Sequence, residues 1–279
     1  MERLLQQRLS GDPGEHVATI PDKAALSDEG GGTAPAERPA LRLLTLNAHQ
    51  GLGALRRRPL LQRIREALRT AAADLVFLQE VGGDTGRDAA GQHYEVLADQ
   101  VWPQHAYGRN AVAGRGHQGN ALLSKYPILR WQNIDVSVGR AEPRGLLHCV
   151  IDVPDLAGPL HAICVHLGLR ETHRRVQVER LFALISDAVP GDAPLVIAGD
   201  FNDWRGLAHR RLAAEPGLKE VCAGTLGLPA RTFPAWRPLL RLDRIYVRGL
   251  RYRMLPLPRR PWSALSDHLP LACEIRGGN

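Results

Sequence analysis

Short apolar runs recur along the chain, and most of them end in a side chain that can bind a metal or transfer a proton. The runs are LRLLTLN, DLVFLQE, LHAICVH and APLVIAGDFN, which close on Asn47, Glu80, His166 and the pair Asp200 and Asn202. Runs of this length and composition predict buried β-strands. Strands of a buried sheet that end in polar residues bring those residues to one edge, so the pattern predicts a site at the mouth of a sheet.

Two further segments carry the same residue types. The run LDRIYV opens with Asp243, and Ser266, Asp267 and His268 directly precede the strand-like run LPLACEI. Between the predicted strands, apolar residues recur at helical spacing and predict amphipathic helices. One helical stripe consists of Leu60, Ile64, Ala67 and Leu68, and a longer one of Val178, Leu181, Phe182, Ile185 and Val189.

The connection between two neighbouring strands limits the fold. The strands over 145–153 and 159–166 are joined by residues 154–158 only. This link is too short for a crossover, so it predicts an antiparallel hairpin and disfavours a purely parallel sheet. We therefore expect an α/β (α+β) fold with mixed, mostly antiparallel sheets and helices outside them.

The candidate segments extend from Asn47 to His268 without a break, which predicts one domain over residues 41–279. Residues 1–40 contain a stretch rich in Gly, Pro, Asp and Ala that shows neither strand nor helix periodicity. We predict that residues 1–40 form a disordered leader. The amino-terminal sequence has no apolar signal core, and no run approaches the length of a membrane span, so we expect a cytoplasmic protein. We also expect a monomer.

The charge of the chain is positive and unevenly distributed. The net charge is +7, but residues 1–40 hold seven acidic and four basic residues, so the remainder carries +10. A basic surface attracts nucleic acid, anionic lipid or small phosphates, or it serves solubility alone. The four cysteines show no CxxC spacing, and Cys149, Cys164 and Cys273 lie in apolar runs, which predicts buried thiols in a reducing compartment.

The residues at the strand ends suit phosphoester chemistry. A carboxylate at a strand end, such as Glu80, is an oxygen ligand that Mg²⁺ or Mn²⁺ prefers, and Asn47 ends the preceding strand. Asp200 and Asn202 have i, i+2 spacing, so in extended geometry both side chains point to one side and can orient water and a phosphoryl oxygen. Each residue alone also fits an ordinary turn or surface position.

An acid/base pair is predicted near the carboxyl terminus. His268 can take a proton from water if a carboxylate holds its other ring nitrogen, and Asp243 is the candidate for that role. Asp267 is then available as a metal ligand. The sequence has no G-x-S-x-G elbow and no GxxxxGK[ST] loop, so neither a serine nucleophile nor a phosphate-binding P-loop is indicated.

The ordered series of motifs resembles the endonuclease/exonuclease/phosphatase superfamily, which has the DNase I-like fold. The series consists of TLN, LQEV, GNALLSKYPI, VHLG, GDFND, LDRIYV and SDH, and it spans Leu41 to Ile275. The resemblance implies a four-layer α/β sandwich in which two mixed sheets are flanked by helices. It also implies a metal-dependent phosphoric ester hydrolase with Mg²⁺ or Mn²⁺ as the cofactor.

The resemblance further implies roles for individual residues. Asn47, Glu80 and Asp267 are the expected metal ligands, and Asp200 and Asn202 orient the nucleophile and the phosphate. His268 and Asp243 form the base dyad, although Asp200 is an alternative proton acceptor. His166 contacts the phosphate or assists the leaving group, and Asn120 is expected to bind substrate.

The substrate class stays open at this point. Aromatic residues interleaved with Arg after Asp200 suit a nucleic acid strand, and they also suit lipid head groups, with Trp236 and Trp262 at an interface. The predicted substrate-binding residues of this region are Arg231, Trp236, Arg259 and Arg260. The stretch RTFPAW to RLDRIYVRG is similar to a bacterial branch of the superfamily that has no settled substrate and is encoded near phospholipid-synthesis genes.

We therefore expect a divalent-metal-dependent phosphodiesterase, in the first place a nuclease that acts on DNA or RNA. A phospholipase C-like or sphingomyelinase-like hydrolase of phospholipid head groups, with peripheral membrane contact, is the alternative. A catalytically inactive binding module on the same fold is the alternative from another class. The complete set of motif residues argues against that last alternative.

Overall fold

The computed structural model describes residues 40–48, 54–84, 93–98, 101–113, 116–139 and 142–278. Apart from its last residue, the predicted leader over residues 1–40 lies outside the described residues. The helices are α1 (Ala54–Thr70), α2 (His93–Ala98), α3 (Glu171–Ala188), α4 (Leu207–Ala213) and α5 (Val221–Leu226), with a 3₁₀ turn, η1 (Trp262–Ala264).

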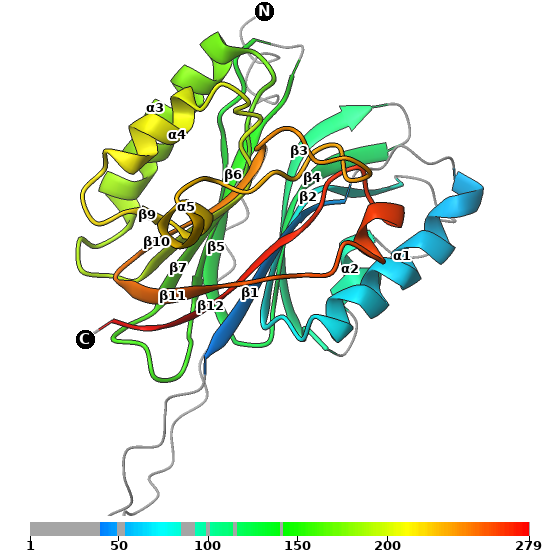
Figure 1. The fold of residues 1–279 in the computed structure, drawn as a ribbon, viewed down its shortest axis with the longest axis horizontal. Coiled ribbons are helices and arrows are strands. Elements are labelled where there is room, and N and C mark those ends of the chain that lie inside the picture. The colour runs from blue at the N-terminus through cyan, green and yellow to red at the C-terminus, as the bar shows by residue number, and fades with distance from the viewer. Residues whose placement is uncertain are drawn as a thin grey trace, which may run out of the picture.

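The strands form two sheets of six strands each (Figure 1). The first sheet has the order β11 (Leu250–Leu255), β12 (Leu271–Gly277), β1 (Leu41–Asn47), β2 (Leu75–Asp84), β4 (Gly116–Ser124) and β3 (Gln104–Ala113). The second sheet has the order β5 (Ile128–Asp135), β6 (Gly145–Ile151), β7 (Leu160–His166), β8 (Leu195–Asp200), β10 (Asp243–Arg248) and β9 (Lys219–Glu220).

Both sheets are mixed and mostly antiparallel, as the sequence predicted. The pairs β1 with β2 and β7 with β8 are parallel. Each parallel pair is connected through a long helix, α1 or α3, because a parallel pair needs a crossover. The predicted hairpin is confirmed, since β6 and β7 pair antiparallel with Leu146 opposite Val165.

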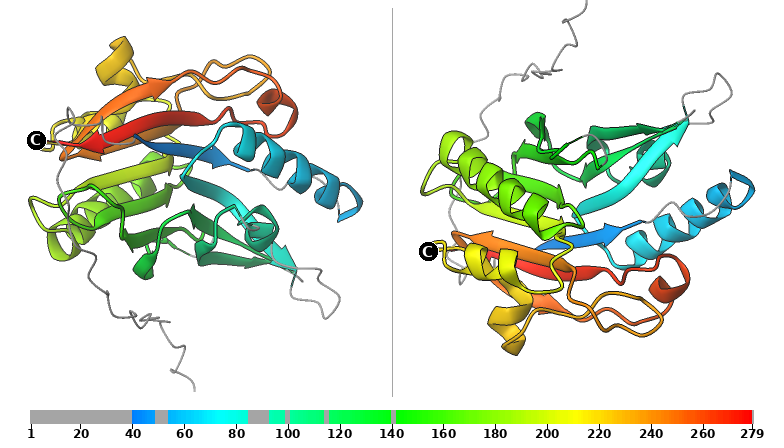
Figure 2. Two further views of the ribbon diagram at one scale, coloured as in Figure 1. Left: turned by 90° about the horizontal axis from the view of Figure 1, so that it is seen from below. Right: turned by 90° about the horizontal axis from the view of Figure 1, so that it is seen from above.

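Helices cover the outer faces of the two sheets, so the molecule has four layers (Figure 2). The apolar residues of α1 and α2 pack on the first sheet, and those of α3 and α4 pack on the second. The central core between the sheets includes Leu43, Phe77, Leu147 and Ala198. This arrangement confirms the predicted four-layer α/β sandwich.

The apolar stripes of the sequence face these layers. Ile64 and Leu68 of α1 and Val178 and Leu181 of α3 are almost fully buried. All four cysteines are buried free thiols, as predicted, and they fill space in the core. Among the described helices, none has the length and apolar character needed to cross a membrane.

Candidate active site

Three of the predicted residues lie side by side at one end of the second sheet. His166 is the last residue of β7 and is in register with Asp200, the last residue of β8. Asp243, the first residue of β10, is in register with Asp200 from the other side. Because neighbouring strands lie about 5 Å apart, strand pairing alone brings these side chains together.

The glycine before Asp200 is required by the close approach of β7 and β8. Gly199 has a φ of +147°, and a Cβ atom added there would lie 2.0 Å from the carbonyl oxygen of Val165. Only glycine avoids this contact and adopts this backbone conformation readily. The Gly-Asp order is therefore part of what positions the Asp200 carboxylate.

The first sheet contributes Asn47 and Glu80 from two neighbouring strands. Asn47 ends β1, while Glu80 lies in an irregular part of β2, where the register against β4 shifts between Leu78 and Val81. Glu80 has a φ of +57°, in the left-handed region. Such a bulge re-aims a side chain at the cost of local strain, and here the re-aimed side chain is the predicted metal ligand.

Asn47 joins the two sheets at the site. Its side-chain amide donates hydrogen bonds to Oε1 of Glu80 and to Oδ2 of Asp200, both at 3.1 Å. Asn47 is buried, and Glu80 keeps 23% of its side chain exposed. The predicted metal-binding pair of the first sheet therefore touches the predicted acid/base group of the second.

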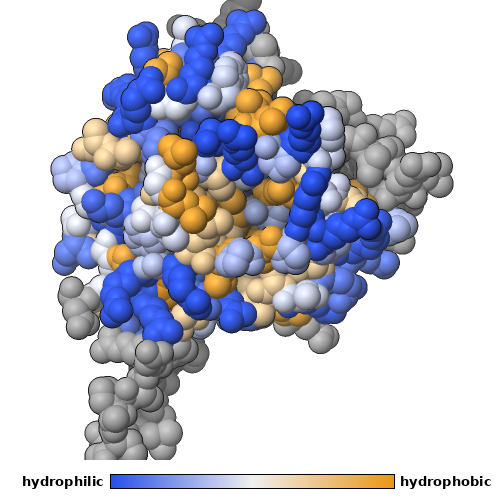
Figure 3. All heavy atoms as spheres, in the orientation of Figure 1, coloured by the Kyte–Doolittle hydropathy of each residue, from blue (hydrophilic) through white to orange (hydrophobic). Residues whose placement is uncertain are grey.

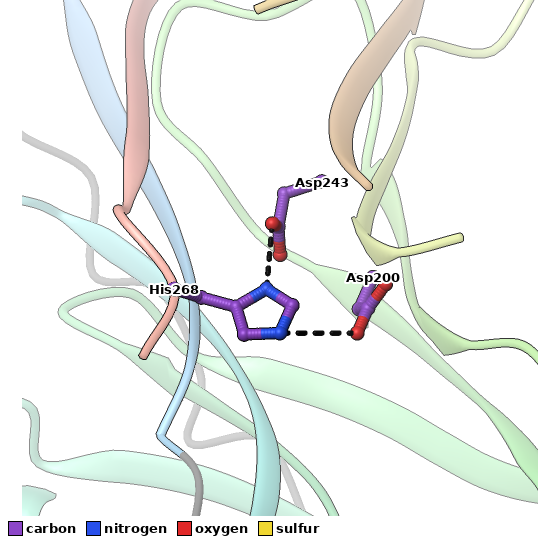
Figure 4. Close-up of side chains that lie close together, drawn as sticks. All are labelled: Asp200, Asp243 and His268. Atoms are coloured by element: carbon purple, nitrogen blue, oxygen red, sulfur yellow. Dashed lines mark hydrogen bonds and ion pairs between the residues drawn. The ribbon is translucent and has the colours of Figure 1, made fainter. Parts of the chain in front are cut away.

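His268 forms the predicted dyad with Asp243 (Figure 4). Its Nδ1 atom lies 2.8 Å from Oδ2 of Asp243, and its Nε2 atom lies 3.9 Å from Oδ2 of Asp200. The hydroxyl of Ser266 holds the loop in place, because it donates to the carbonyl of Asn47 at 2.6 Å and accepts from the backbone N–H of His268 at 3.0 Å.

Burial and neighbouring charges shift the pKa values of this group. Burial and the charge of Asp243 raise the pKa of Asp200 to about 6. Burial opposes a charged imidazole at His268, but the carboxylates of Asp243 and Asp200 outweigh this effect and raise its pKa to about 10. Since pH 7 lies above the pKa of Asp200 and below that of His268, Asp200 is an anion and His268 is a cation at neutral pH.

His166 has a different environment and stays neutral. Its Nε2 atom lies 3.8 Å from a carboxylate oxygen of Glu80 and 3.8 Å from one of Asp200. Burial lowers its pKa well below the ordinary value, and the charges of Arg144 and His268 lower it further. A neutral imidazole donates one hydrogen bond from its protonated nitrogen and accepts one at the other nitrogen, and the donor suits contact with a phosphate or a leaving group.

A small cavity opens beside His166 and Glu80. Its volume is about 140 Å³, and its lining includes Glu80, Asn110, Gly119, Arg144 and His166. The lining is mostly polar and contains one cationic side chain, Arg144, so the cavity suits a charged group of modest size such as a phosphate.

Arg144 is the residue that the sequence reasoning missed. Its Nε donates to the carbonyl of Leu167 at 3.2 Å, and its Nη2 donates to Glu142 at 3.0 Å. These bonds hold the guanidinium at the cavity, with 17% of the side chain exposed. In the sequence Arg144 is only one of many arginines before an apolar run, so no local signal distinguishes it.

The prediction of an extended Asp200-x-Asn202 pair was wrong. β8 ends at Asp200, and Asn202 has a φ of +48°, so the two residues do not share one strand face. Instead the carboxylate of Asp200 accepts the backbone N–H of Asn202 at 2.8 Å, and the Asn202 amide donates to the carbonyl of Leu167. The turn forms because Asp accepts hydrogen bonds from the backbone two residues on.

Asn120 is fully buried between the sheets. Its amide donates to the carbonyl oxygens of Gly145 and Cys164 at 2.9 and 3.4 Å, and its Oδ1 atom has no hydrogen-bond partner within the described part of the chain. These contacts tie β4 to the second sheet. A role of Asn120 in substrate binding stays a prediction.

The segment that carries Arg231 and Trp236 packs against the His268 loop. The ring of Phe233 lies 4.9 Å from the ring of His268, and the carbonyl of Thr232 accepts the N–H of Leu269. Arg231, Trp236, Arg259 and Arg260 are exposed, and Nε of Arg259 donates to the carbonyl of Ala235 at 3.2 Å. Their role in substrate binding stays a prediction.

Trp262 does not lie at an interface, so it takes no part in the lipid alternative that the sequence left open. It is 2% exposed and packs with Leu265 and the apolar face of α1, because a large apolar ring gains more from burial there. A hollow of about 630 Å³ beside it, between α1 and residues 257–265, is lined by none of the predicted site residues.

The side chains at the site fit a divalent cation. Glu80 and the hydrogen-bonded Asn47 provide carboxylate and amide oxygens, and Asp267 adjoins them through Ser266, whose hydroxyl contacts both the Asn47 carbonyl and the Asp267 carboxylate. Oxygen atoms of these groups are the donors that Mg²⁺ and Mn²⁺ prefer. Asp200 is buried and lies beside the carboxylate of Asp243, and both conditions raise its pKa. One possible ligand atom each of Asp200, Asp243 and His268 also lies within 4.8 Å of the other two, but His268 and Asp243 are already hydrogen-bonded to each other.

A four-layer sandwich with this group of side chains at the edge of both sheets defines a DNase I-like hydrolase. A model of the Endonuclease/Exonuclease/phosphatase family matches residues 44–268. The chain therefore belongs to this family, whose members are metal-dependent phosphoric ester hydrolases.

Comparison with individual proteins agrees with this assignment. The chain is 47% identical over 246 residues to the uncharacterized protein YbhP of Escherichia coli (strain K12). The aligned region covers 85% of this chain and 96% of YbhP. The human Nocturnin catalytic domain with bound sulfate has a TM-score of 0.69 at 22% identity, covering 86% of this chain and 94% of that one. An endonuclease/exonuclease/phosphatase from Beutenbergia cavernae has a TM-score of 0.67 at 22% identity, and the match covers 87% of this chain and 72% of that one.

Proposed function

We propose that this protein hydrolyses a phosphodiester by in-line attack of water, with Mg²⁺ or Mn²⁺ held by Glu80 and Asn47 and with Asp267 as a further ligand. The observation that supports this proposal best is the pair of hydrogen bonds from Asn47 to Glu80 and to Asp200. The side chain of Asn47 thereby connects the proposed cation ligand Glu80 to the proposed proton acceptor Asp200. When bound, the cation stabilises charge on a phosphoryl oxygen.

Proton transfer involves Asp200, His268 and Asp243. The sequence predicted His268 as the base, held by Asp243. With a pKa of about 10 His268 is protonated at neutral pH, whereas Asp200 with a pKa of about 6 is ionised. In this charge state Asp200 is the better acceptor for the proton of water, and we assign to the imidazolium of His268 the stabilisation of negative charge on the phosphate.

The remaining side chains bind the phosphate and the leaving group. Arg144 provides a fixed positive charge at the cavity beside His166. The neutral imidazole of His166 donates a hydrogen bond to a phosphoryl or leaving-group oxygen. Asn202 stabilises the turn after β8 and thereby fixes the Asp200 carboxylate, a positioning role in addition to the predicted contact with phosphate.

DNA or RNA is the first candidate for the substrate. Residues beyond the first forty carry a net charge of +10, and exposed arginines such as Arg231 and Arg259 adjoin the His268 loop. Arginines beside a phosphodiester site attract a polyanion and hold its flanking phosphates.

A phospholipid head group is the second candidate, and one observation favours it. Trp236, Leu239 and Leu240 are exposed in the segment that packs against His268. Exposed aliphatic side chains beside a catalytic site suit an apolar environment better than a nucleic acid.

The test is hydrolysis by the purified protein with Mg²⁺ or Mn²⁺, with and without EDTA. The substrates are a soluble aryl phosphodiester, single-stranded and double-stranded DNA, RNA, and vesicles of sphingomyelin or glycerophospholipid. EDTA-sensitive hydrolysis that Glu80→Gln lacks supports the proposal, and the preferred substrate identifies the class. No hydrolysis of any substrate with either metal contradicts it and favours the inactive binding module.

A further inference from the structure

Exposed apolar side chains occur in the loops that follow β7 and β8 and in the loop that precedes β10, at the end of the second sheet where the site lies. Five large apolar residues of the described chain belong to this group, and each is between 39% and 68% exposed. We call them the rim residues: Leu169, Trp204, Trp236, Leu239 and Leu240. Exposed large apolar residues are ordinary when they are scattered singly, but a group around one site indicates an interaction surface.

On one side of the mouth the rim residues follow His166 and Asn202 closely in the chain. Leu169 comes three residues after His166, and Trp204 comes two residues after Asn202. The buried side chain of Arg174 connects them, because its guanidinium donates to the carbonyl of Leu169 at 2.6 Å and lies 4.6 Å from the centre of the Trp204 ring. Arg174 therefore connects the loops that carry Leu169 and Trp204, and both side chains stay exposed.

On the other side the rim residues belong to a turn that packs on His268. Phe233 contacts the His268 ring, and its carbonyl accepts the N–H groups of Leu239 and Leu240 at 2.8 Å. These bonds close a turn over residues 233–240 with Trp236 near its tip. The two sides of the rim are thus both tied to residues of the site.

Exposed arginines accompany the rim residues in the sequence. Leu169, Trp204 and Trp236 are each followed directly by an exposed arginine, namely Arg170, Arg205 and Arg237. Figure 3 shows apolar groups interleaved with strongly hydrophilic ones on the face that it presents. The rim residues and the arginines that follow them therefore combine apolar and basic side chains.

Three acidic residues close to Leu169 and Trp204 are paired within the protein. Glu142 bonds Arg144, Glu171 bonds Arg174, and buried Asp203 pairs with Arg244 at 3.4 Å. Because these three acids already have partners, they do not cancel the positive charge of Arg170 and Arg205 on this side of the rim.

We propose that the rim residues dock the protein onto a lipid bilayer that contains anionic phospholipids. Trp and Leu insert at the boundary between head groups and acyl chains, while Arg side chains bind the anionic head groups. A nucleic acid explains the tryptophans and arginines, but it offers no apolar environment for Leu169, Leu239 and Leu240. The aliphatic side chains therefore favour the bilayer.

This docking goes beyond the proposed hydrolysis, since it concerns binding of the protein to a membrane and not the reaction. It also orients the mouth of the site towards the head groups, because the rim residues lie on both sides of it. Docking does not require turnover, so it is tested with EDTA present. Failure to bind vesicles and failure to hydrolyse a phosphodiester are then separate results.

The experiment measures co-sedimentation of the full chain with phosphatidylcholine vesicles, with and without phosphatidylglycerol, in EDTA. Leu169→Asp combined with Leu239→Asp is the test variant. Leu226→Asp is the matched control, because Leu226 is 62% exposed and belongs to α5, outside the rim. Thermal unfolding and hydrolysis of a soluble aryl phosphodiester by each variant show that the fold and the site are intact.

We expect binding to the vesicles with phosphatidylglycerol, weakened by salt, and a loss of at least about tenfold in affinity in the double variant, with no loss in Leu226→Asp. Absence of binding to anionic vesicles overturns the proposal. An equal loss in Leu226→Asp also overturns it. Loss of binding to single-stranded DNA in the double variant, with vesicle binding unchanged, assigns the rim to nucleic acid instead.

Discussion

The Nδ1 atom of His268 lies 2.8 Å from Oδ2 of Asp243, and this contact spans the two sheets of the molecule. His268 belongs to the loop before β12 in the first sheet, and Asp243 begins β10 in the second. Asn47 and Asp200 make a second contact between the sheets at the same edge. The site therefore exists only when the two sheets pack against each other, and substitutions there test function and packing together.

Removal of the His268 imidazole is expected to lower kcat by about 10²–10⁴-fold with little change in KM, the usual size of a lost acid/base or charge-stabilising group. The measurement is steady-state hydrolysis of a soluble phosphodiester by His268→Ala. Asp243→Asn is expected to lower kcat in the same direction, since it removes the carboxylate that raises the pKa of His268. Full turnover in His268→Ala would show that the dyad takes no part in the reaction.

Glu80→Gln is expected to weaken metal binding and to be rescued in part by high Mn²⁺. The carboxamide keeps one oxygen donor but loses the negative charge. Calorimetric titration with Mg²⁺ and Mn²⁺ measures the loss directly, and hydrolysis at increasing Mn²⁺ measures the rescue. Glu95→Gln is the control, because Glu95 is an exposed residue of α2 outside the site. Unchanged metal affinity in Glu80→Gln would remove Glu80 from the ligand set.

Arg144→Ala is expected to raise KM by about tenfold or more, which corresponds to the loss of a hydrogen bond to a charged group. Arg144→Lys is expected to recover part of the loss, because lysine restores the charge but not the planar donor pair. Arg180→Ala is the control, since Arg180 is exposed and donates to a backbone carbonyl away from the cavity. A normal KM in Arg144→Ala would mean that the cavity does not bind the phosphate.

Gly199→Ala is expected to lower the free energy of unfolding by about 1–3 kcal/mol or more, because the backbone is strained and β7 must move. The added methyl group would lie 2.0 Å from the Val165 carbonyl oxygen. Gly191→Ala is the matched control, since an added Cβ atom there meets no atom within 4 Å. Urea denaturation of both variants measures the difference. Equal stabilities would show that the two strands tolerate a side chain at position 199.

Acid is expected to destabilise the protein through the His148 and His161 pair. Their ring nitrogens Nε2 and Nδ1 lie 3.0 Å apart on β6 and β7, and burial, aided by the charge of His161, lowers the pKa of His148 to about 4. The unfolded chain binds a proton at about 6.5, so the stability contributed by neutral His148 is present above pH 6.5 and is lost as the pH falls from 6.5 to 4.

This loss amounts to about 3 kcal/mol in the free energy of unfolding at most. Urea denaturation between pH 7 and pH 4 measures it for the wild type and for His148→Gln. The glutamine variant keeps a polar group opposite His161 but has no titrating imidazole. We expect its stability to fall less steeply with acid, and identical pH profiles would exclude His148 as the cause.

Much of the fold follows from local patterns in the sequence. The runs that end at Asn47, Glu80, His166 and Asp200 predict strands. Three of these strands end where predicted, at Asn47, His166 and Asp200, whereas β2 continues past Glu80 to Asp84. The short link after β6 predicts the antiparallel hairpin, since five residues cannot form a crossover. Strand periodicity and connection length are local properties, and for this reason they can be read without coordinates.

Other features depended on contacts between distant residues. The left-handed conformation of Asn202 is fixed by two hydrogen bonds, from its backbone N–H to Asp200 and from its side-chain amide to the carbonyl of Leu167. The prediction that GDFN is extended was wrong for this reason. Trp262 has the same residue type as exposed Trp236, yet only packing against α1 decides that Trp262 is buried. Arg144 is recognised only because folding places it at the cavity with His166.

The sequence by itself determined which strands form, which residue types stand at their ends, and therefore the kind of chemistry that the edge can support. The tertiary structure decided which of these residues meet. It set the bulge that turns Glu80 inwards, the pairing of His268 with Asp243 across the sheets, and the exposure of the rim residues. Hydrophobic periodicity acts between neighbours in the chain, whereas burial, pKa and contact across two sheets depend on the packing of the whole molecule.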